Sequence, residues 1–368
     1  MTKNRRISFG IQLQSKETMS KTLNISPNAI TTTGLPQSSA VAGISTETQV
    51  AYSTICTIAI VGNSLVILVF VWDKKLLKKS YNLLILFLAI ADVLTATLLI
   101  TNPAFVLGDA FPYPTNPVLG EIFCRVIWSR AFIFQLVVCS VYLSLALTAE
   151  RWFAIVKPQK YGTFFTKKRI LIYVVSSWVW SFALTSSGVI EKSYNPSSNK
   201  ICEHKTYSPG SFFRPFVGSF QVLMKVFFPC LVMIGLYIHM VINTNKSPVA
   251  SLESKAKLRG KINRMICTAC FILMICLAPN QIFLVFVWAG KAKLDTKLHH
   301  VLALLTFIST CVNPFIYGLT NKNYRHRYRK ILFAMCPRAL GEGARVVRVD
   351  TADRVLHSQP STQEETRQ

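Results

Sequence analysis

The chain is short of acidic residues and of charge in general. Its 368 residues include 16 Asp and Glu against 41 Lys and Arg, and only 15% of all residues are charged. That share is below the roughly 25% of an ordinary soluble domain. A hydrophobic content of 51% excludes a disordered basic protein and argues against a nucleic-acid binder, which would be more polar. The combination indicates a membrane protein whose basic residues lie in its loops.

The sequence also lacks the cysteines of a disulfide framework, with ten in the whole chain. Most of them lie inside apolar runs, where a thiol usually serves as a small buried hydrophobe. We find no catalytic acid pair, no His/Cys metal-binding spacing and no nucleophile motif. An enzyme is therefore not predicted.

Seven runs are long enough to cross a bilayer, which takes about 20 mostly apolar residues. They cover residues 51–72, 81–107, 126–150, 170–190, 215–243, 262–289 and 298–320. Isolated charged or proline residues interrupt them, and such groups inside a membrane bundle are functional candidates. The sequence therefore predicts an all-α membrane protein, with a seven-transmembrane helix bundle over residues 51–320.

Further segments lie on either side of the bundle. Residues 1–50 are rich in Ser and Thr, contain no apolar run, and are predicted to form a disordered extracellular tail. Residues 321–336 combine an apolar stripe at helical period with basic residues, which predicts an amphipathic helix on the inner leaflet. Residues 337–368 are predicted to be a disordered cytoplasmic tail. Asn24 is a glycosylation acceptor or a chance match, and Cys336 is a palmitoylation site or an ordinary free cysteine.

The loops set the orientation. Those that follow the first, third and fifth spans hold 16 Lys and Arg, whereas those that follow the second, fourth and sixth hold seven. Basic loops stay in the cytoplasm. We therefore expect a multi-pass plasma-membrane protein with its amino terminus outside and its carboxyl terminus inside.

Each span also carries unusual residues whose order is informative. They are Gly62-Asn63, Leu88 to Asp92, Glu150-Arg151-Trp152, Trp178, Pro229 with Tyr237, Cys276 to Pro279, and Asn313-Pro314 with Tyr317. In this order and topology the chain resembles the class A (rhodopsin-like) G-protein-coupled receptors over residues 51–336. It is more loosely similar to galanin- and allatostatin-type neuropeptide receptors.

The resemblance implies an activation machinery on the cytoplasmic side. In the family, an arginine paired with the acid before it is released on activation and contacts a heterotrimeric G protein, and arrestin is a further partner. Proline kinks supply the deformable points of such a bundle. The residues of this sequence that match the coupling and activation positions are Glu150, Arg151, Trp152, Tyr237, Pro279, Asn313, Pro314 and Tyr317.

The resemblance also implies a buried polar cluster around Asp92. Its partners would be Asn63, Ser140, Ser309 and Asn313, whose oxygen and amide groups suit a sodium ion. The alternative is a protonated, hydrogen-bonded Asp92 without an ion. No other cofactor is expected.

On the outer side, the family pairs two cysteines that correspond to Cys124 and Cys202. The segment Asn195-Pro-Ser-Ser-Asn199 has strong turn chemistry, and its flanks, 190–194 and 200–204, are predicted to pair as a hairpin. Peptide receptors of this family often carry such a hairpin.

The chain departs from the family pattern in several places. Cys124 and Arg151 are 27 positions apart, two more than usual, so extra residues are expected near the outer end of the third span. Leu277 stands where the family commonly has Trp, and Trp152 stands where it has Tyr. Glu253 is the only acid near the start of the sixth span, which suggests that the second restraint on Arg151 is absent and that basal activity is raised.

Residue types that are missing from the third and seventh spans narrow the class of ligand. No acid lies between Ile122 and Ala149, which argues against an amine ligand, and no Lys lies in 298–320, which excludes a retinal Schiff base. Lys225 is either an anion anchor or a lysine that reaches to the outer membrane boundary. The candidate pocket residues are Arg130, Gln135, Lys225 and Gln281.

A neuropeptide is the first expectation for the ligand, and an acidic lipid or metabolite is the alternative. A seven-span transporter or channel is a distant alternative, because no internal repeat is seen and Asp92 is the only acid at mid-membrane depth.

Overall fold

Long helices make up almost all of the chain that the structure, a computed structural model, describes. The described residues are 45–108, 111, 114–196, 201–204, 213–245, 253–293 and 296–335. The predictions for Asn24, for Cys336 and for residues 337–368 lie outside them.

Each predicted span contains a long helix, although the second, predicted to end at residue 107, leaves α2 at Ile100 and passes through non-helical Thr101 and Asn102. The first four correspond to α1 (Thr46–Trp72), α2 (Ser80–Ile100), α4 (Ala131–Val156) and α6 (Lys167–Thr185). The last three correspond to α8 (Phe213–Val222) with η5 (Leu223–Phe227) and α9 (Phe228–Asn245), to α10 (Glu253–Trp288), and to α11 (Lys297–Thr320). Among the described residues, six helical segments are long and apolar enough to cross a membrane. The remaining predicted span, α6, opens with three basic residues, which leaves it a shorter apolar run.

The predicted ends of several spans were wrong. Residues 46–50, assigned to the tail, form the first turns of α1, where the hydroxyl of Ser45 accepts a hydrogen bond from the Thr48 N–H and Glu47 lies in the first turn. A hydroxyl cap and an acid at this end stabilise a helix. The sixth helix, α10, begins at Glu253 rather than at residue 262. Hydropathy detects only the part of a helix that lies in lipid, so polar turns beyond the bilayer escape it.

The third span was predicted to begin at residue 126, and the structure corrects this as well. A helical segment, α3 (Pro117–Ile122), leads into the π-helix η4 (Phe123–Trp128). The chain then breaks at Arg130, whose φ of 61° is the only positive value among the described non-glycine residues. A π-turn closes its hydrogen bonds over one more residue than an α-turn. The departures from regular α-helix between Cys124 and Arg151 thus lie at the start of the third span.

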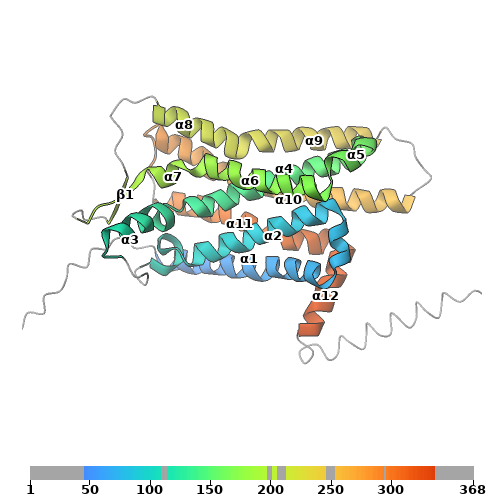
Figure 1. The fold of residues 1–368 in the computed structure, drawn as a ribbon, viewed down its shortest axis with the longest axis horizontal. Coiled ribbons are helices and arrows are strands. Elements are labelled where there is room, and N and C mark those ends of the chain that lie inside the picture. The colour runs from blue at the N-terminus through green and yellow to red at the C-terminus, as the bar shows by residue number, and fades with distance from the viewer. Residues whose placement is uncertain are drawn as a thin grey trace, which may run out of the picture. The chain divides into compact units, whose positions relative to one another are not determined.

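Close contacts between helices depend on small side chains. A Cβ atom added to Gly62 in α1 would lie 3.1 Å from Cγ of Pro314 in α11, so glycine permits this approach. The third span, α4, contacts α2, α6 and α9, and α1 lies against α2 and α11 (Figure 1).

Short elements lie at the two ends of the bundle. The predicted hairpin is confirmed as β1 (Lys192–Tyr194) and β2 (Cys202–His204), which pair antiparallel. It lies near α3 at one end, whereas α5 (Pro158–Phe164) and α12 (Lys322–Met335) lie at the other (Figure 1). The remaining short helices are η1 (Lys74–Lys78), η2 (Pro103–Leu107) and α7 (Ser187–Ile190).

The helix predicted at 321–336 is α12, and it is amphipathic as expected. Tyr324, Tyr328 and Ile331 are buried, whereas Arg325 and Arg329 are exposed. The Tyr324 hydroxyl donates to Oδ1 of Asn82 in α2 at 2.9 Å. This bond attaches α12 to the end of the bundle.

Candidate functional site

Glu150 and Arg151 form a buried ion pair near the end of α4. The arginine Nε and Nη2 donate to the two oxygens of the carboxylate, and the guanidinium lies 4.3 Å from the centroid of the Tyr81 ring. The side chains are 0% and 9% exposed for Glu150 and Arg151 respectively. A two-pronged arrangement of this kind is among the strongest charge-assisted contacts, so Arg151 is held by its neighbour.

A third residue, Tyr161 in α5, also binds the carboxylate of Glu150. Its hydroxyl donates to Oε1 of Glu150 at 2.5 Å. Burial, and secondly the negative charge of Glu150, raise the pKa of Tyr161 to about 12. The phenol therefore stays protonated at neutral pH and remains a donor. The loop helix α5 thus carries a restraint that no sequence motif indicated.

Trp152 points to a different helix. Its indole N–H donates to Nδ1 of His239 in α9 at 2.8 Å, and the two rings stack with centroids 5.7 Å apart. Tyr237, two residues earlier in α9, is 44% exposed, whereas Tyr317 is buried against Tyr324. Within the part of the chain that the structure describes, the Tyr317 hydroxyl has no hydrogen-bond partner, so this conformation does not join Tyr237 to Tyr317.

Pro314 interrupts the backbone hydrogen bonding of α11. Because Pro314 has no N–H, the carbonyl of Thr310 loses its usual donor within the helix. Asn63 of α1 supplies a replacement, since its Nδ2 donates to that carbonyl at 2.8 Å. Pro279 lies inside α10, where it is followed by the buried Asn280, whose Oδ1 has no partner.

Asp92 is 1% exposed and has two side-chain donors. Ser140 Oγ donates to its Oδ1 at 3.2 Å, and Asn313 Nδ2 donates to its Oδ2 at 3.0 Å. The other two expected partners are not among its hydrogen-bond donors. Ser309 donates to the carbonyl of Thr306 at 2.6 Å, and Asn63 donates to backbone carbonyls.

The donor chemistry around Asp92 nevertheless fits a small hard cation. A carboxylate and neutral oxygens are the ligands that such ions prefer. The Oδ1 atom of Asn63 is buried and has no hydrogen-bond partner among the described residues. An unpaired buried oxygen carries a desolvation cost that a cation or a water would relieve.

At the other end of the bundle, a disulfide joins Cys124 in η4 to Cys202 in β2, with Cα atoms 5.4 Å apart. The hairpin is also attached to α3, because the backbone N–H of Tyr194 donates to Oε2 of Glu121 at 2.6 Å. A Cβ on Gly120 would lie 2.5 Å from the Tyr194 ring, so only glycine fits there. The expected pair of cysteines is present, and the hairpin is fixed to η4 and α3, which precede α4.

The candidate pocket residues have separate surroundings. Lys225 Nζ donates to Oε1 of Gln221 at 3.1 Å, and Gln221 Nε2 in turn donates to Ser187 Oγ at 3.0 Å. The guanidinium of Arg130 lies 5.6 Å from the centroid of the Phe105 ring. The contacts of the two cations thus involve different elements, and the structure shows none between them.

Gln135 and Gln281 are both buried. Gln135 donates to the carbonyl of Trp178 at 3.5 Å, which is long for a hydrogen bond. Sequence reasoning did not find Gln221, Glu121, Tyr161 or His239, because their partners lie on other elements or several turns away. Two one-turn spacings were usable signals: Glu121 forms an ion pair with Arg125, and Gln221 accepts a hydrogen bond from Lys225.

A helix bundle with a buried Glu-Arg pair at one end and a disulfide-bound hairpin at the other defines a seven-transmembrane receptor. The family described as 7 transmembrane receptor (rhodopsin family) matches residues 62–317. The chain belongs to this family and is a receptor, not an enzyme.

Similar proteins agree with this membership. The chain is 28% identical to the allatostatin-A receptor of Bombyx mori, over 82% of both chains. It is 25% identical to the somatostatin receptor type 5 of Bos taurus, over 77% of this chain and 75% of that one. It is 27% identical to the C-C chemokine receptor type 6 of Homo sapiens, with the same two coverages.

Proposed function

We propose that the chain is a plasma-membrane receptor for an extracellular neuropeptide and that it activates a heterotrimeric G protein. The observation that carries the coupling is the Glu150–Arg151 ion pair. It is buried, it is held further by Tyr161, and it lies at the end of the bundle opposite the hairpin (Figure 1). A charge held by a breakable pair is suited to a two-state switch.

Two kinds of observation support a peptide as the ligand. The similar proteins named above are receptors for allatostatin-A, for somatostatin and for C-C chemokines by their names. The hairpin β1–β2 is fixed by the disulfide and by Glu121, so it offers preorganised backbone beside the bundle mouth. Preorganisation lowers the entropic cost of binding an extended ligand.

Lys225 supports the alternative of an acidic lipid or metabolite. It lies in η5, and its ammonium donates to Oε1 of Gln221. Glu191 also acts electrostatically on this lysine, and an anionic group on the ligand would add a charge-assisted contact. A carboxylate of a peptide would use the same contact, so the two ligand classes differ in their remaining contacts.

In the proposed orientation the amino terminus lies outside and the basic loops lie in the cytoplasm. Ligand binding at the hairpin end favours a second packing of the bundle. In that packing α10 pivots near Pro279, Arg151 leaves Glu150, and the cytoplasmic ends of α4 and α10 contact the G protein. Arrestin is a further proposed partner of this surface.

We also propose a sodium ion at Asp92 as an allosteric ligand. Asp92 and Ser140 supply a carboxylate and a hydroxyl, and the unpaired Oδ1 of Asn63 is a further oxygen on an adjacent helix. The ion would neutralise the buried carboxylate, and it would favour the packing in which these oxygens lie closest.

The proposal is tested by expressing the chain in cells that lack it and measuring nucleotide exchange on a panel of G proteins. A library of amidated and free-acid neuropeptides is applied beside a library of acidic lipids and metabolites. Activation by a peptide supports the first choice of ligand, and activation by acidic small molecules alone supports the alternative. Transport of a solute without nucleotide exchange would contradict both.

A further inference from the structure

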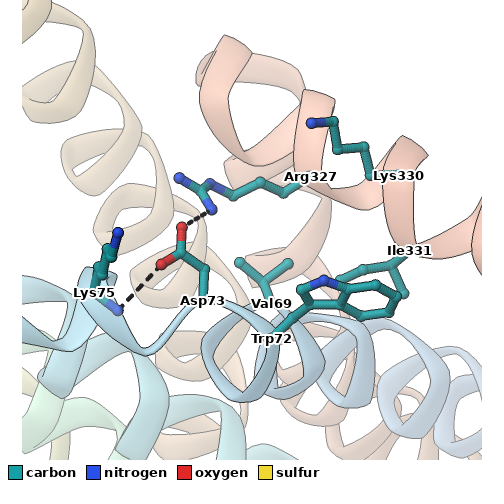
Figure 2. A pocket seen from close by; sticks show the side chains of 7 residues that line it. All are labelled: Val69, Trp72, Asp73, Lys75, Arg327, Lys330 and Ile331. Atoms are coloured by element: carbon teal, nitrogen blue, oxygen red, sulfur yellow. Dashed lines mark hydrogen bonds and ion pairs between the residues drawn. The ribbon is translucent and has the colours of Figure 1, made fainter.

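A cavity of about 380 Å³ lies where the end of α1 meets η1 and α12. This volume is within the roughly 300–1,000 Å³ range of small-ligand sites. Its lining residues include none of the predicted ligand-pocket residues and neither Glu150 nor Arg151, and its walls come from segments more than 250 positions apart. Its lining residues, all labelled in Figure 2, are Val69, Trp72, Asp73, Lys75, Arg327, Lys330 and Ile331.

The cavity carries an excess of positive charge. Three of its lining residues are cations and one is an acid. Arg327 Nη1 pairs with Oδ2 of Asp73, while the other oxygen of that carboxylate accepts from the backbone N–H of Lys75 at 3.1 Å. Because Asp73 supplies one negative charge against the three positive charges of the lining, the cavity keeps a net positive charge. Both lysines are exposed, and neither ammonium forms an ion pair with the described residues.

Asp73 holds Arg327 at the cavity wall, but the guanidinium keeps further N–H donors for a ligand. The hydrogen bond from Arg327 is the main reason that the pKa of Asp73 lies below its usual value. Asp73 is thus ionised at neutral pH and fixes the guanidinium. One nitrogen of the guanidinium contacts the carboxylate, and the group has several N–H donors in a planar fork that suits phosphate oxygens.

The other wall of the cavity is apolar. Figure 2 shows Val69, Trp72 and Ile331 together, on the side away from Lys75. Trp72 ends the apolar helix α1 and is 65% exposed. An exposed Trp at the end of a membrane helix is typical of headgroup depth. The cavity therefore has cations for a headgroup beside an exposed aromatic surface for an acyl chain.

We propose that this cavity binds the phosphorylated headgroup of an anionic lipid. Lys75, Arg327 and Lys330 contact the phosphate oxygens, and an acyl chain runs along Trp72. The lipid bridges α1 and α12, so it holds the amphipathic helix against the bundle. The inner leaflet as its source rests on the proposed orientation, but the binding itself does not.

The matched variants differ only in where charge is removed. Lys75→Ala with Lys330→Ala removes one lysine from the loop and one from α12, both at the cavity. Lys78→Ala with Lys322→Ala removes one lysine from each of the same two elements, outside the lining residues. All four side chains are exposed, so folding should survive, and the thermal unfolding midpoint checks this.

The full chain is titrated in detergent with phosphatidylinositol bisphosphate, and lipid adducts are counted by native mass spectrometry. Because detergent presents no leaflets, the result does not depend on the orientation. We expect the cavity variant to bind about tenfold more weakly, since it loses two charge-assisted contacts, and the control variant to change less than about twofold. Equal weakening in both variants would mean diffuse attraction to the basic surface and would overturn the site. No weakening in either would overturn it as well.

A second measurement separates lipid from free phosphate. Inositol trisphosphate and inorganic phosphate are tested as competitors, and Trp72→Ala is tested against the intact lipid. We expect weaker binding of the lipid to Trp72→Ala and poor competition by both soluble anions. Competition by the soluble anions at the affinity of the lipid, with no effect of Trp72→Ala, would contradict a lipid site. Neither result bears on whether the receptor binds a peptide, because no agonist is present.

Discussion

The indole N–H of Trp152 donates to Nδ1 of His239 across the gap between α4 and α9, at 2.8 Å. The bond is made by the residue that directly follows Arg151. It therefore joins the third and fifth spans beside the charged pair that we propose to couple to the G protein. Any motion that separates α9 from α4 must break it.

We expect Trp152→Phe to raise ligand-independent signalling. The substitution keeps an aromatic ring for stacking but removes the N–H donor. A neutral hydrogen bond contributes about 0.5–1 kcal/mol net when partly solvated, which is roughly a two- to fivefold change in the ratio of the two packings. Basal nucleotide exchange, normalised to surface expression, measures it.

His239→Phe is the matched partner variant, since it removes the acceptor and keeps a ring. It should raise basal exchange by the same factor, and the double variant should go no further than either single one. Additive effects would show that the two side chains act separately.

Tyr161→Phe should remove the hydrogen bond that the phenol donates to Glu150. The lost bond is charge-assisted and part-buried, so we expect a destabilisation of about 1 kcal/mol, seen as a lower thermal unfolding midpoint. The pKa of Tyr161 is raised from its ordinary value of 10.0 to about 12. Its contribution is therefore complete below the ordinary value and is lost only as the pH rises through the raised one.

Between about pH 6 and about pH 9 the difference between wild type and Tyr161→Phe should thus be constant. A difference that disappears within this window would show that the phenol is not the donor. Tyr173→Phe is a suitable control, because its hydroxyl donates to the Phe164 carbonyl and not to an acid.

Lys225→Met should reduce the affinity for an acidic ligand. The substitution keeps length and apolar character but removes the charge. Loss of a charge-assisted contact costs about 1.5–3 kcal/mol, or roughly ten- to a hundredfold in affinity. Competition binding measures it, once an agonist is known. Wild-type affinity in Lys225→Met would place the charge of this lysine outside ligand recognition.

Asp92→Asn should abolish any dependence of thermal stability and agonist affinity on NaCl, measured against equal choline chloride. The carboxylate charge that would hold the ion is then gone. Ser140→Ala and Ser309→Ala form a matched pair, because only Ser140 donates to Asp92. We expect Ser140→Ala to weaken the sodium response and Ser309→Ala to leave it intact. A sodium response that persists in Asp92→Asn would exclude the ion from this site.

Much of the fold could be predicted from the sequence because the membrane imposes a simple rule. An apolar run of about 20 residues must be helical to satisfy its backbone in lipid, and the spans were found this way. The ends of these helices could not be found in the same way, because the turns at Thr46 and Glu253 are polar. Nor were η4 and the positive φ of Arg130, because a π-turn changes the hydrogen bonding of the backbone without a marked change in composition.

The site was predictable to the extent that residue order carries it. Glu150 with Arg151, Asp92 with Asn313, and the two cysteines all meet in the structure. Asn63 does not donate to Asp92, because it donates to the Thr310 carbonyl, which Pro314 leaves without its helical donor. A backbone partner on another helix cannot be recognised from the sequence. The bond from Trp152 to His239 escaped prediction because it depends on the relative rotation of α4 and α9.

The most direct test of the proposed function compares wild type with Arg151→Ala, measuring agonist binding and nucleotide exchange on the same membranes. We predict that a peptide found in the screen binds both forms with similar affinity, and that exchange is lost in the variant. Because Arg151 lies at the end of α4 far from the hairpin (Figure 1), its removal should spare the ligand site. Full peptide-stimulated exchange in Arg151→Ala would contradict the proposed coupling mechanism.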